Sequence, residues 1–163
     1  MDLIDEFFAH AVKLSAPGEP STTEQVDFRR AVSAAYYAVF HLLTTTAAES
    51  WAVGRERHRF ARLFEHGKVR DASLALPAKL KKRLGDNPSP EDRKTADTLG
   101  AIAKEFVALQ QDRHSADYDN ARIWSYTEVE KVILRAHGLY MRWITVSKTP
   151  LAESYLLDML GGK

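Results

Sequence analysis

The stretch DFRRAVSAAYYAVFHLL (Asp27–Leu43) decides the fold, because it predicts one long, unbroken helix. It has no glycine or proline, and its apolar residues recur at every third or fourth position, as on one face of an α-helix. The residues of this face are Val32, Tyr36, Val39 and Leu43. Ser21 and Glu24 have the spacing of a capping box, so we expect the helix to run from there to about Thr45.

Helices are also expected on both sides of this one. An earlier helix at about 2–14 has Asp2 as its cap. Its apolar stripe consists of Ile4, Phe7, Phe8 and Val12. One or two shorter basic helices are expected between 55 and 85, with breaks near Gly67 and Pro77, because both residue types disfavour helix interiors.

Three further helices are expected after the loop NPSP. Ser89 is the predicted cap of the first, with Pro90 at the first helical position. Thr127, with Glu130 three residues later, predicts the start of the next. The apolar residues of that helix are Val129, Val132, Ile133, Ala136, Tyr140, Trp143 and Ile144. A short helix at 149–160 follows.

Together these helices predict an all-α protein: a bundle of four to five main helices with short extra helices. At 163 residues, the chain is expected to form one domain over 1–163, with its core at about 2–146 and the short C-terminal helix at 149–160. No strand-like alternation of apolar and polar residues is sustained anywhere in the sequence.

Composition narrows the classes of function. Hydrophobic residues make up 45% of the chain, enough for a core, and the absence of cysteine excludes thiolate chemistry and disulfides. There is no run of about 18 apolar residues and no basic segment at the N-terminus. We therefore expect a cytoplasmic protein without a signal peptide or membrane span. We also expect no metal and no cofactor, because no metal-ligand spacing or glycine-rich phosphate loop is present.

Positive charge is concentrated in one region, although the net charge is only +1. Between Arg55 and Arg83 there are ten Lys or Arg residues and three Asp or Glu, a balance of +7, whereas the rest of the chain has a balance of −6. This region is a candidate anion-binding surface. The alternative is a solvated helical face, which charge runs usually form.

Arg113 is the first candidate site residue, because helical spacing places it on a buried face. The apolar residues that precede it on this face are Leu99, Ile102, Phe106 and Leu109. A step of four then reaches Arg113, and a step of three reaches Ala116. A partly buried arginine needs a partner for its charge, and Asp117 is in reach. The functional interpretation is phosphate binding by the planar guanidinium, and the alternative is a cation that bonds the last carbonyls of its helix.

A polar stripe on the helix of the opening stretch is the second candidate. It consists of Arg30, Ser33, Tyr37 and His41. Their spacings of three, four and four residues place them on one face. The functional interpretation is that this stripe faces Arg113 across a groove. The alternative is that Tyr37 and His41 are amphipathic residues at the edge of the core.

The stretches RRAVSAAYYAVFH (29–41) and RHSADYD (113–119) resemble the HEPN family, small all-helical proteins of prokaryotic defence and toxin–antitoxin systems that are often paired with a minimal nucleotidyltransferase. The resemblance covers about 2–143 and implies a helical bundle that forms homodimers. In active ribonucleases of the family, an arginine and a histidine with four to six residues between them form a metal-independent site at the dimer interface. There the 2′-hydroxyl of RNA attacks the adjacent phosphate, with the histidine handling protons and the arginine stabilising charge.

The sequence departs from this family pattern at the histidine. With Arg113 as the motif arginine, the histidine is expected at position 118, 119 or 120. Position 118 is a tyrosine, Tyr118, and neither 119 nor 120 is a histidine. His114 adjoins the arginine but lies about 100° round the helix from it. Arg59 and His66 have the motif spacing in another segment, and we interpret that match as chance.

Three functions remain open at this point. The first is a dimeric HEPN-like module with a degenerate ribonuclease motif, which binds RNA, a nucleotide or a nucleotidyltransferase-type partner. The second is a metal-independent endoribonuclease of toxin type, in which Arg113 acts with a displaced histidine, His114 or His41. The third is a pure protein-interaction module. The predicted binding residues are Arg30, Tyr37, Asp117 and Tyr118, and by resemblance Tyr118 is also a candidate for modification by a nucleotidyltransferase.

Overall fold

The computed structural model describes residues 3–16 and 24–161. Over this part of the chain it has seven helices and no strand, which confirms the all-α prediction. The helices are α1 (Leu3–Ser15), α2 (Glu24–Trp51), α3 (Glu56–Ala61), α4 (His66–Leu84), α5 (Pro90–Tyr118), α6 (Tyr126–Val146) and α7 (Pro150–Met159).

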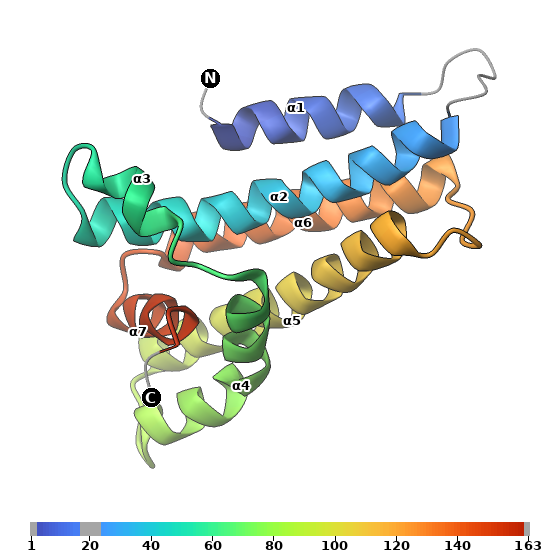
Figure 1. Ribbon diagram of the computed structural model, residues 1–163. Helices are drawn as coiled ribbons and strands as arrows, with labels where there is room; N and C mark the ends of the chain where they lie inside the picture. The colour runs from blue at the N-terminus through green and yellow to red at the C-terminus, as the bar shows by residue number, and fades with distance from the viewer. Residues whose placement is uncertain (1–2, 17–23, 162–163) are drawn as a thin grey trace.

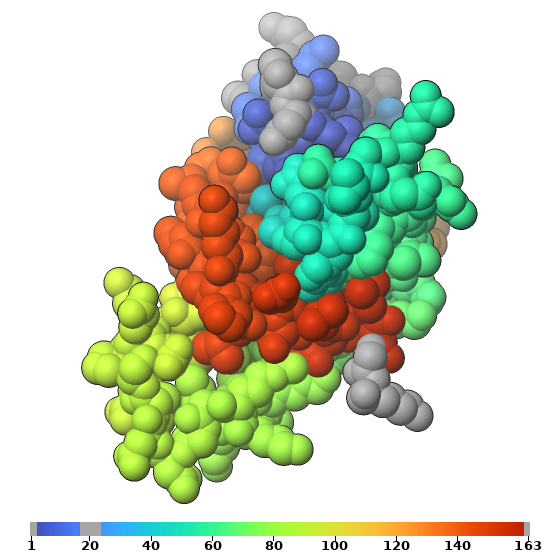
Figure 2. Space-filling model, turned by 90° about the vertical axis from the view of Figure 1, so that its left-hand side faces the viewer, coloured from blue at the N-terminus to red at the C-terminus, as the bar shows by residue number. Residues whose placement is uncertain are grey.

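Helix α2 lies at the centre of the bundle (Figure 1). Helices α1 and α6 run alongside it, and α5 packs against both α2 and α6. Helices α4 and α7 pack against each other and against α5, and α3 packs on the C-terminal part of α2. Figure 2 shows that end of the molecule, where α3 lies between α1 and α7 and the turn between α4 and α5 projects to one side.

The apolar face of α2 forms the middle of the core, as the opening stretch predicts. Its four predicted core residues, Val32, Tyr36, Val39 and Leu43, are completely buried. The helix is longer than predicted because the apolar face continues through Ala47 and Ala48, and Trp51 then contacts Phe60 of α3. The predicted caps Asp2 and Ser21 lie outside the described residues.

Two apolar residues predicted to face the core point to solvent instead. In α1, Val12 is exposed and its neighbour Ala11 is buried, because the small alanine lets α1 lie close to α2. In α6, Ile144 is exposed, and Leu139 joins the core in the same row as Trp143. Each difference is a shift of helical phase, and one residue turns a side chain by about 100°.

The predicted break near Pro77 is wrong, because this residue lies inside α4. The predicted break near Gly67 is close to the observed one, since α3 ends at Ala61 and α4 begins at His66. Gly67 is in the first turn, where a weak helix former matters least. Pro77 removes one backbone hydrogen bond, but Leu76 and Leu80 beside it are buried and hold both halves of the helix against the core. The axis of α4 changes direction along its length, as a proline in a helix interior causes (Figure 1).

Local side-chain contacts determine where α5 and α6 begin. The Ser89 side chain accepts a hydrogen bond from the Asp92 backbone N–H at 3.0 Å, which confirms the predicted cap. The predicted start of α6 at Thr127 is wrong: Ser125 and Glu128 form a complete capping box two residues earlier. Thr127 and Glu130 have the same spacing as Ser125 and Glu128. The helix begins at the earlier pair, in which the Ser125 backbone N–H donates to the Glu128 carboxylate at 2.8 Å.

The C-terminal helix α7 belongs to the same core as the other helices. Its Tyr155 is fully buried and shares a hydrogen bond of 2.6 Å with Ser73 of α4. The Asp158 carboxylate forms ion pairs with Lys79 at 2.8 Å and Arg83 at 2.9 Å. No helix within the described ranges is both long enough and apolar enough to cross a membrane.

Candidate functional site

The last turns of α5 bring Arg113 from the core to the surface. The preceding residues of its face, Leu99, Ile102, Phe106 and Leu109, are completely buried, and Ala116 after it is almost so. Arg113 keeps about a fifth of its side-chain surface (20%) exposed. The helical phase predicted from the sequence is therefore confirmed, and the guanidinium lies where the core meets solvent.

Arg113 contacts both α2 and its own helix. Its Nη2 donates a hydrogen bond to the Tyr37 hydroxyl at 3.1 Å, and its Nε lies 2.7 Å from the Asp117 carboxylate. The other Asp117 oxygen accepts a hydrogen bond of 2.6 Å from Ser33. The predicted ion pair with Asp117 is thus present. The polar stripe of α2 does face the end of α5, through Ser33 and Tyr37.

The electrostatics of this contact keep Arg113 charged. Burial lowers the pKa of Arg113, but the negative charge of Asp117 and the contact with Tyr37 outweigh burial, so its pKa lies above the ordinary value. The guanidinium also lies 5.6 Å from the centroid of the Tyr37 ring and 5.8 Å from that of Tyr118. These are cation–π distances, which favour a flat guanidinium held between two rings.

An arginine of α2 positions the end of α5. Arg29 donates hydrogen bonds to the backbone carbonyls of Ala116 at 2.8 Å, Asp119 at 2.9 Å and Arg122. The last carbonyls of a helix have no partner within the helix, so Arg29 supplies one and holds the following loop as well. The polar stripe predicted on α2 begins one residue later, at Arg30, and spacing alone does not distinguish Arg29 from this neighbour.

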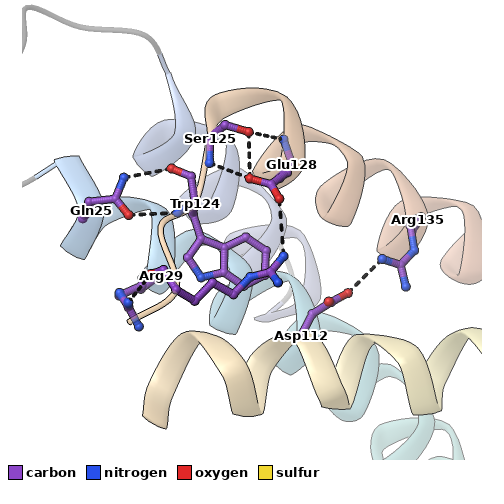
Figure 3. Close-up of polar contacts among 8 residues, drawn as sticks. Gln25, Arg29, Asp112, Trp124, Ser125, Glu128 and Arg135 are labelled. Atoms are coloured by element: carbon purple, nitrogen blue, oxygen red, sulfur yellow. Dashed lines mark hydrogen bonds and ion pairs between the residues drawn. The ribbon is translucent and has the colours of Figure 1, made fainter. Parts of the chain in front are cut away.

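A second contact fixes the loop between α5 and α6 (Figure 3). The Gln25 amide bonds both the backbone N–H and the carbonyl of Trp124, at 3.0 and 2.8 Å. The Trp124 side chain is buried, and the Arg122 guanidinium lies 4.2 Å from its ring centroid. Together with Arg29, Gln25 therefore holds the segment after Arg113 against α2.

His66 brings an unexpected histidine to this region. It is the first residue of α4, and its backbone carbonyl accepts a hydrogen bond of 3.0 Å from Gln110, one turn before Arg113. Its Nδ1 shares a hydrogen bond of 2.7 Å with the Tyr36 hydroxyl, and its ring centroid lies 5.8 Å from that of Tyr37. The spacing interpretation of His66 as a chance match therefore missed a residue that the fold brings beside Tyr37.

His66 is held in its neutral form. Burial lowers its pKa, and the positive charge of Arg113 and the electrostatic interaction with His41 lower it further. Burial also lowers the pKa of His41, which stacks on Phe7 of α1 with ring centroids 5.3 Å apart. Two imidazoles that are neutral near pH 7 thus flank Tyr37, the residue that Arg113 contacts. We call Arg113, Tyr37, His41 and His66 the arginine–histidine cluster.

The other predicted site residues lie around the cluster. His114 is exposed and contacts Tyr118, with ring centroids 4.9 Å apart, so it turns away from the groove on α2. Tyr118 is 64% exposed, which leaves most of its ring open to solvent. Arg30 is exposed and lines a hollow of about 410 Å³ together with Tyr37 and Asp117.

Half of the cations in the basic segment 55–83 have a carboxylate partner. Five of its ten cations form ion pairs: Arg59 with Glu56, Lys68 with Glu65, Arg70 with Asp71, and Lys79 and Arg83 with Asp158. The segment also divides between α3 and α4, so it does not form one continuous basic face. Within the described residues there is no group of three or more His, Asp or Glu side chains that suits a metal ion.

A second arginine centre lies where α5 packs against α6. Arg135 of α6 donates to the Glu105 carboxylate at 2.6 Å. It also donates to the Asp112 carboxylate at 2.8 Å, and Figure 3 shows this second contact. Asp112 directly precedes Arg113, so adjacent residues of α5 serve two separate arginine centres. Arg135 has a carboxylate on each of two nitrogens and joins α5 to α6.

Comparison with known proteins adds no relative. No family model matches the chain, and neither the curated proteins nor the solved structures include a match.

Proposed function

We propose that this protein is a dimeric HEPN-type module that binds the phosphate groups of RNA or of a nucleotide at the arginine–histidine cluster. The observation that supports the proposal is the state of Arg113: charged, partly exposed, and held on an aromatic ring beside two neutral histidines. The resemblance noted in the sequence adds the expectations of a homodimer and of a nucleotidyltransferase-type partner.

The guanidinium of Arg113 has capacity for a ligand. Its Nε faces Asp117 and its Nη2 donates to Tyr37, while Nη1 donates to no described residue. A phosphate that approaches from the hollow lined by Arg30, Tyr37 and Asp117 can accept hydrogen bonds from Nη1 and from the Tyr37 hydroxyl. The planar fork of arginine suits such a contact, and charge-assisted hydrogen bonds are about twice as strong as neutral ones.

Binding of a short single-stranded RNA, measured by fluorescence anisotropy, tests the proposal. We expect Arg113→Ala to weaken binding by at least about tenfold, because one charge-assisted contact of about 1.5–3 kcal/mol is lost. Arg142→Ala is the matched control, because Arg142 is an exposed arginine on α6 and we expect no more than the uniform effect of one surface charge. Equal affinities of the two variants would refute the proposal.

The second candidate is a metal-independent endoribonuclease, and it is favoured by the two histidines beside Tyr37. In such a reaction the 2′-oxygen forms a bond to phosphorus while the bond from phosphorus to the 5′-oxygen breaks. A neutral imidazole accepts the 2′-hydroxyl proton, and a protonated group gives one to the departing 5′-oxygen. Burial lowers the pKa of His66, and the nearby charge of Arg113 lowers it further, which keeps this imidazole unprotonated and able to accept a proton.

Cleavage of RNA in the presence of EDTA tests the ribonuclease. We expect His66→Gln and His41→Gln each to lower the rate by at least about a hundredfold, in line with the usual contribution of general acid–base groups. His114→Gln is the matched control, because His114 is exposed and lies about 100° round α5 from Arg113. No cleavage by the wild-type protein, or a rate that only His114→Gln lowers, would contradict this candidate.

A further inference from the structure

A pocket of about 690 Å³ lies between α2 and α3, next to the arginine–histidine cluster. Its inner wall is apolar and aromatic and includes Phe40, Phe64 and Ala48. All three side chains are buried in the core, so the wall is held firmly. A volume of this size suits a small organic ligand.

The rim of this pocket carries two arginines, together with His58 and the exposed carboxylate of Glu49. Arg57 and Arg62 line it from α3 and the residue after it, and both are exposed. The Nε of Arg57 donates to the Ala52 carbonyl at 3.1 Å, and Arg62 has no ion pair with the residues that the structure describes. These two guanidinium groups are part of the basic segment and form no ion pair within the described residues, whereas the other end of that segment pairs with Asp158. A ligand with an apolar, planar part and a negative charge fits this combination.

His41 connects the pocket to the cluster. It lines the pocket and also lies against Tyr37, with ring centroids 6.4 Å apart. Tyr37, His41 and Thr45 follow each other at steps of four on α2, so they form one row about 12 Å long at 1.5 Å per residue. A phosphate at Arg113 and a base in the pocket are therefore neighbours along a single strand.

We propose that the pocket binds the base of the nucleotide next to the phosphate held at Arg113, and that Arg57 and Arg62 hold the following phosphate. This inference rests on the proposed function, because it assigns to the same ligand a base site and a second anchor. Base contacts with aromatic and apolar side chains are tolerant of sequence and contribute about 1–3 kcal/mol per base in single-strand-binding proteins. The ligand is thus single-stranded RNA rather than a free phosphate.

Binding of two strands of equal length tests the inference: a ribo-oligonucleotide of four nucleotides, and the same ribose-phosphate chain without bases. We expect the wild-type protein to bind the strand with bases at least about tenfold more tightly. Thr45→Trp fills the pocket from a half-buried position, and we expect it to remove this preference while leaving the affinity for the abasic strand unchanged. Thr145→Trp, at an exposed threonine of α6, is the matched control.

Arg62→Ala is the second variant, because this exposed position tolerates truncation without risk to the fold. We expect it to weaken binding of both strands about equally, since it removes a phosphate contact. Equal wild-type affinity for the two strands, or a preference that Thr45→Trp leaves intact, would overturn the pocket inference. If Arg113→Ala leaves both affinities unchanged while the preference for bases persists, the proposed function fails and the pocket stands. Failure to bind either strand would overturn both.

Discussion

Two arginines, Arg113 on α5 and Arg135 on α6, show how the same side chain serves different purposes. Arg135 contacts two carboxylates, Glu105 and Asp112, at 2.6 and 2.8 Å. Arg113 has one carboxylate, Asp117, which it shares with Ser33, and its other contacts are a hydroxyl and two aromatic rings. The first arrangement neutralises the guanidinium, and the second leaves part of it able to bind another anion.

The difference teaches that the partners of an arginine, more than its burial, indicate its role. The Arg135 side chain is 36% exposed, more than the 20% of Arg113, yet it has less capacity for a ligand. Both centres depend on the phase of α5, because Asp112 and Arg113 are adjacent and point to different sides of the helix. Arg135 is therefore a structural arginine, and Arg113 is the candidate binding arginine.

The largest effect on folding is expected at Arg29, which positions the segment that carries Arg113. Arg29→Ala removes three hydrogen bonds to backbone carbonyls, and the Ala116 carbonyl is left at a buried position. We expect a loss of about 2–3 kcal/mol in the free energy of unfolding, measured by urea denaturation. Hydrogen exchange should rise at 116–122 and stay unchanged in α6. Exchange that rises equally in both regions would contradict this separation.

The next effect compares the two arginine centres directly. Arg135→Ala leaves two carboxylates without their partner, so we expect it to lower the free energy of unfolding by about 1–2 kcal/mol after allowance for the exposure of these groups. We expect Arg113→Ala to lower it by about half as much, because only Asp117 loses its partner and Ser33 still donates to it. The check is urea denaturation of both variants. A larger loss for Arg113→Ala would make Arg113 the structural arginine.

A smaller effect on stability is expected from the protonation of His66. Its pKa is lowered in the folded protein, while the unfolded chain keeps a pKa near 6.5. As the pH falls below about 6.5, the unfolded chain binds the proton more readily, so stability falls there and is fully present above about pH 7.5. We expect His66→Gln to flatten this dependence between pH 5 and 7.5 by less than about 1 kcal/mol, because the ring is partly solvated. Melting temperatures across this range are the measurement, and parallel curves for the two proteins would contradict the prediction.

Helical periodicity was sufficient to predict most of the fold. It placed the core faces of α2 and α5 correctly, since an unbroken apolar row on a long helix leaves one phase that buries it. It failed at Val12, where the tight packing of Ala11 on α2 determined the phase. The break predicted near Pro77 from residue preference was also wrong, because that preference was overridden by the burial of Leu76 and Leu80.

Part of the candidate site could also be predicted. The apolar face of α5 predicted the position of Arg113, and the charge of Arg113 predicted its ion pair with Asp117. Both predictions depend only on spacing within one helix. His66 could not be found in this way, since its place beside Tyr37 depends on how α4 packs against α5. Arg29 was missed for a related reason: three backbone carbonyls form its partner, and they carry no side-chain signal in the sequence.

The most direct test of the central claim compares lysine substitutions at the two arginines. Arg113→Lys and Arg135→Lys both keep the positive charge and remove the planar fork. The measurement is the affinity of each variant for a short single-stranded RNA at fixed salt concentration. We expect Arg113→Lys to weaken binding at least about tenfold and Arg135→Lys to bind like the wild-type protein. Equal affinities of both variants and the wild type would contradict it.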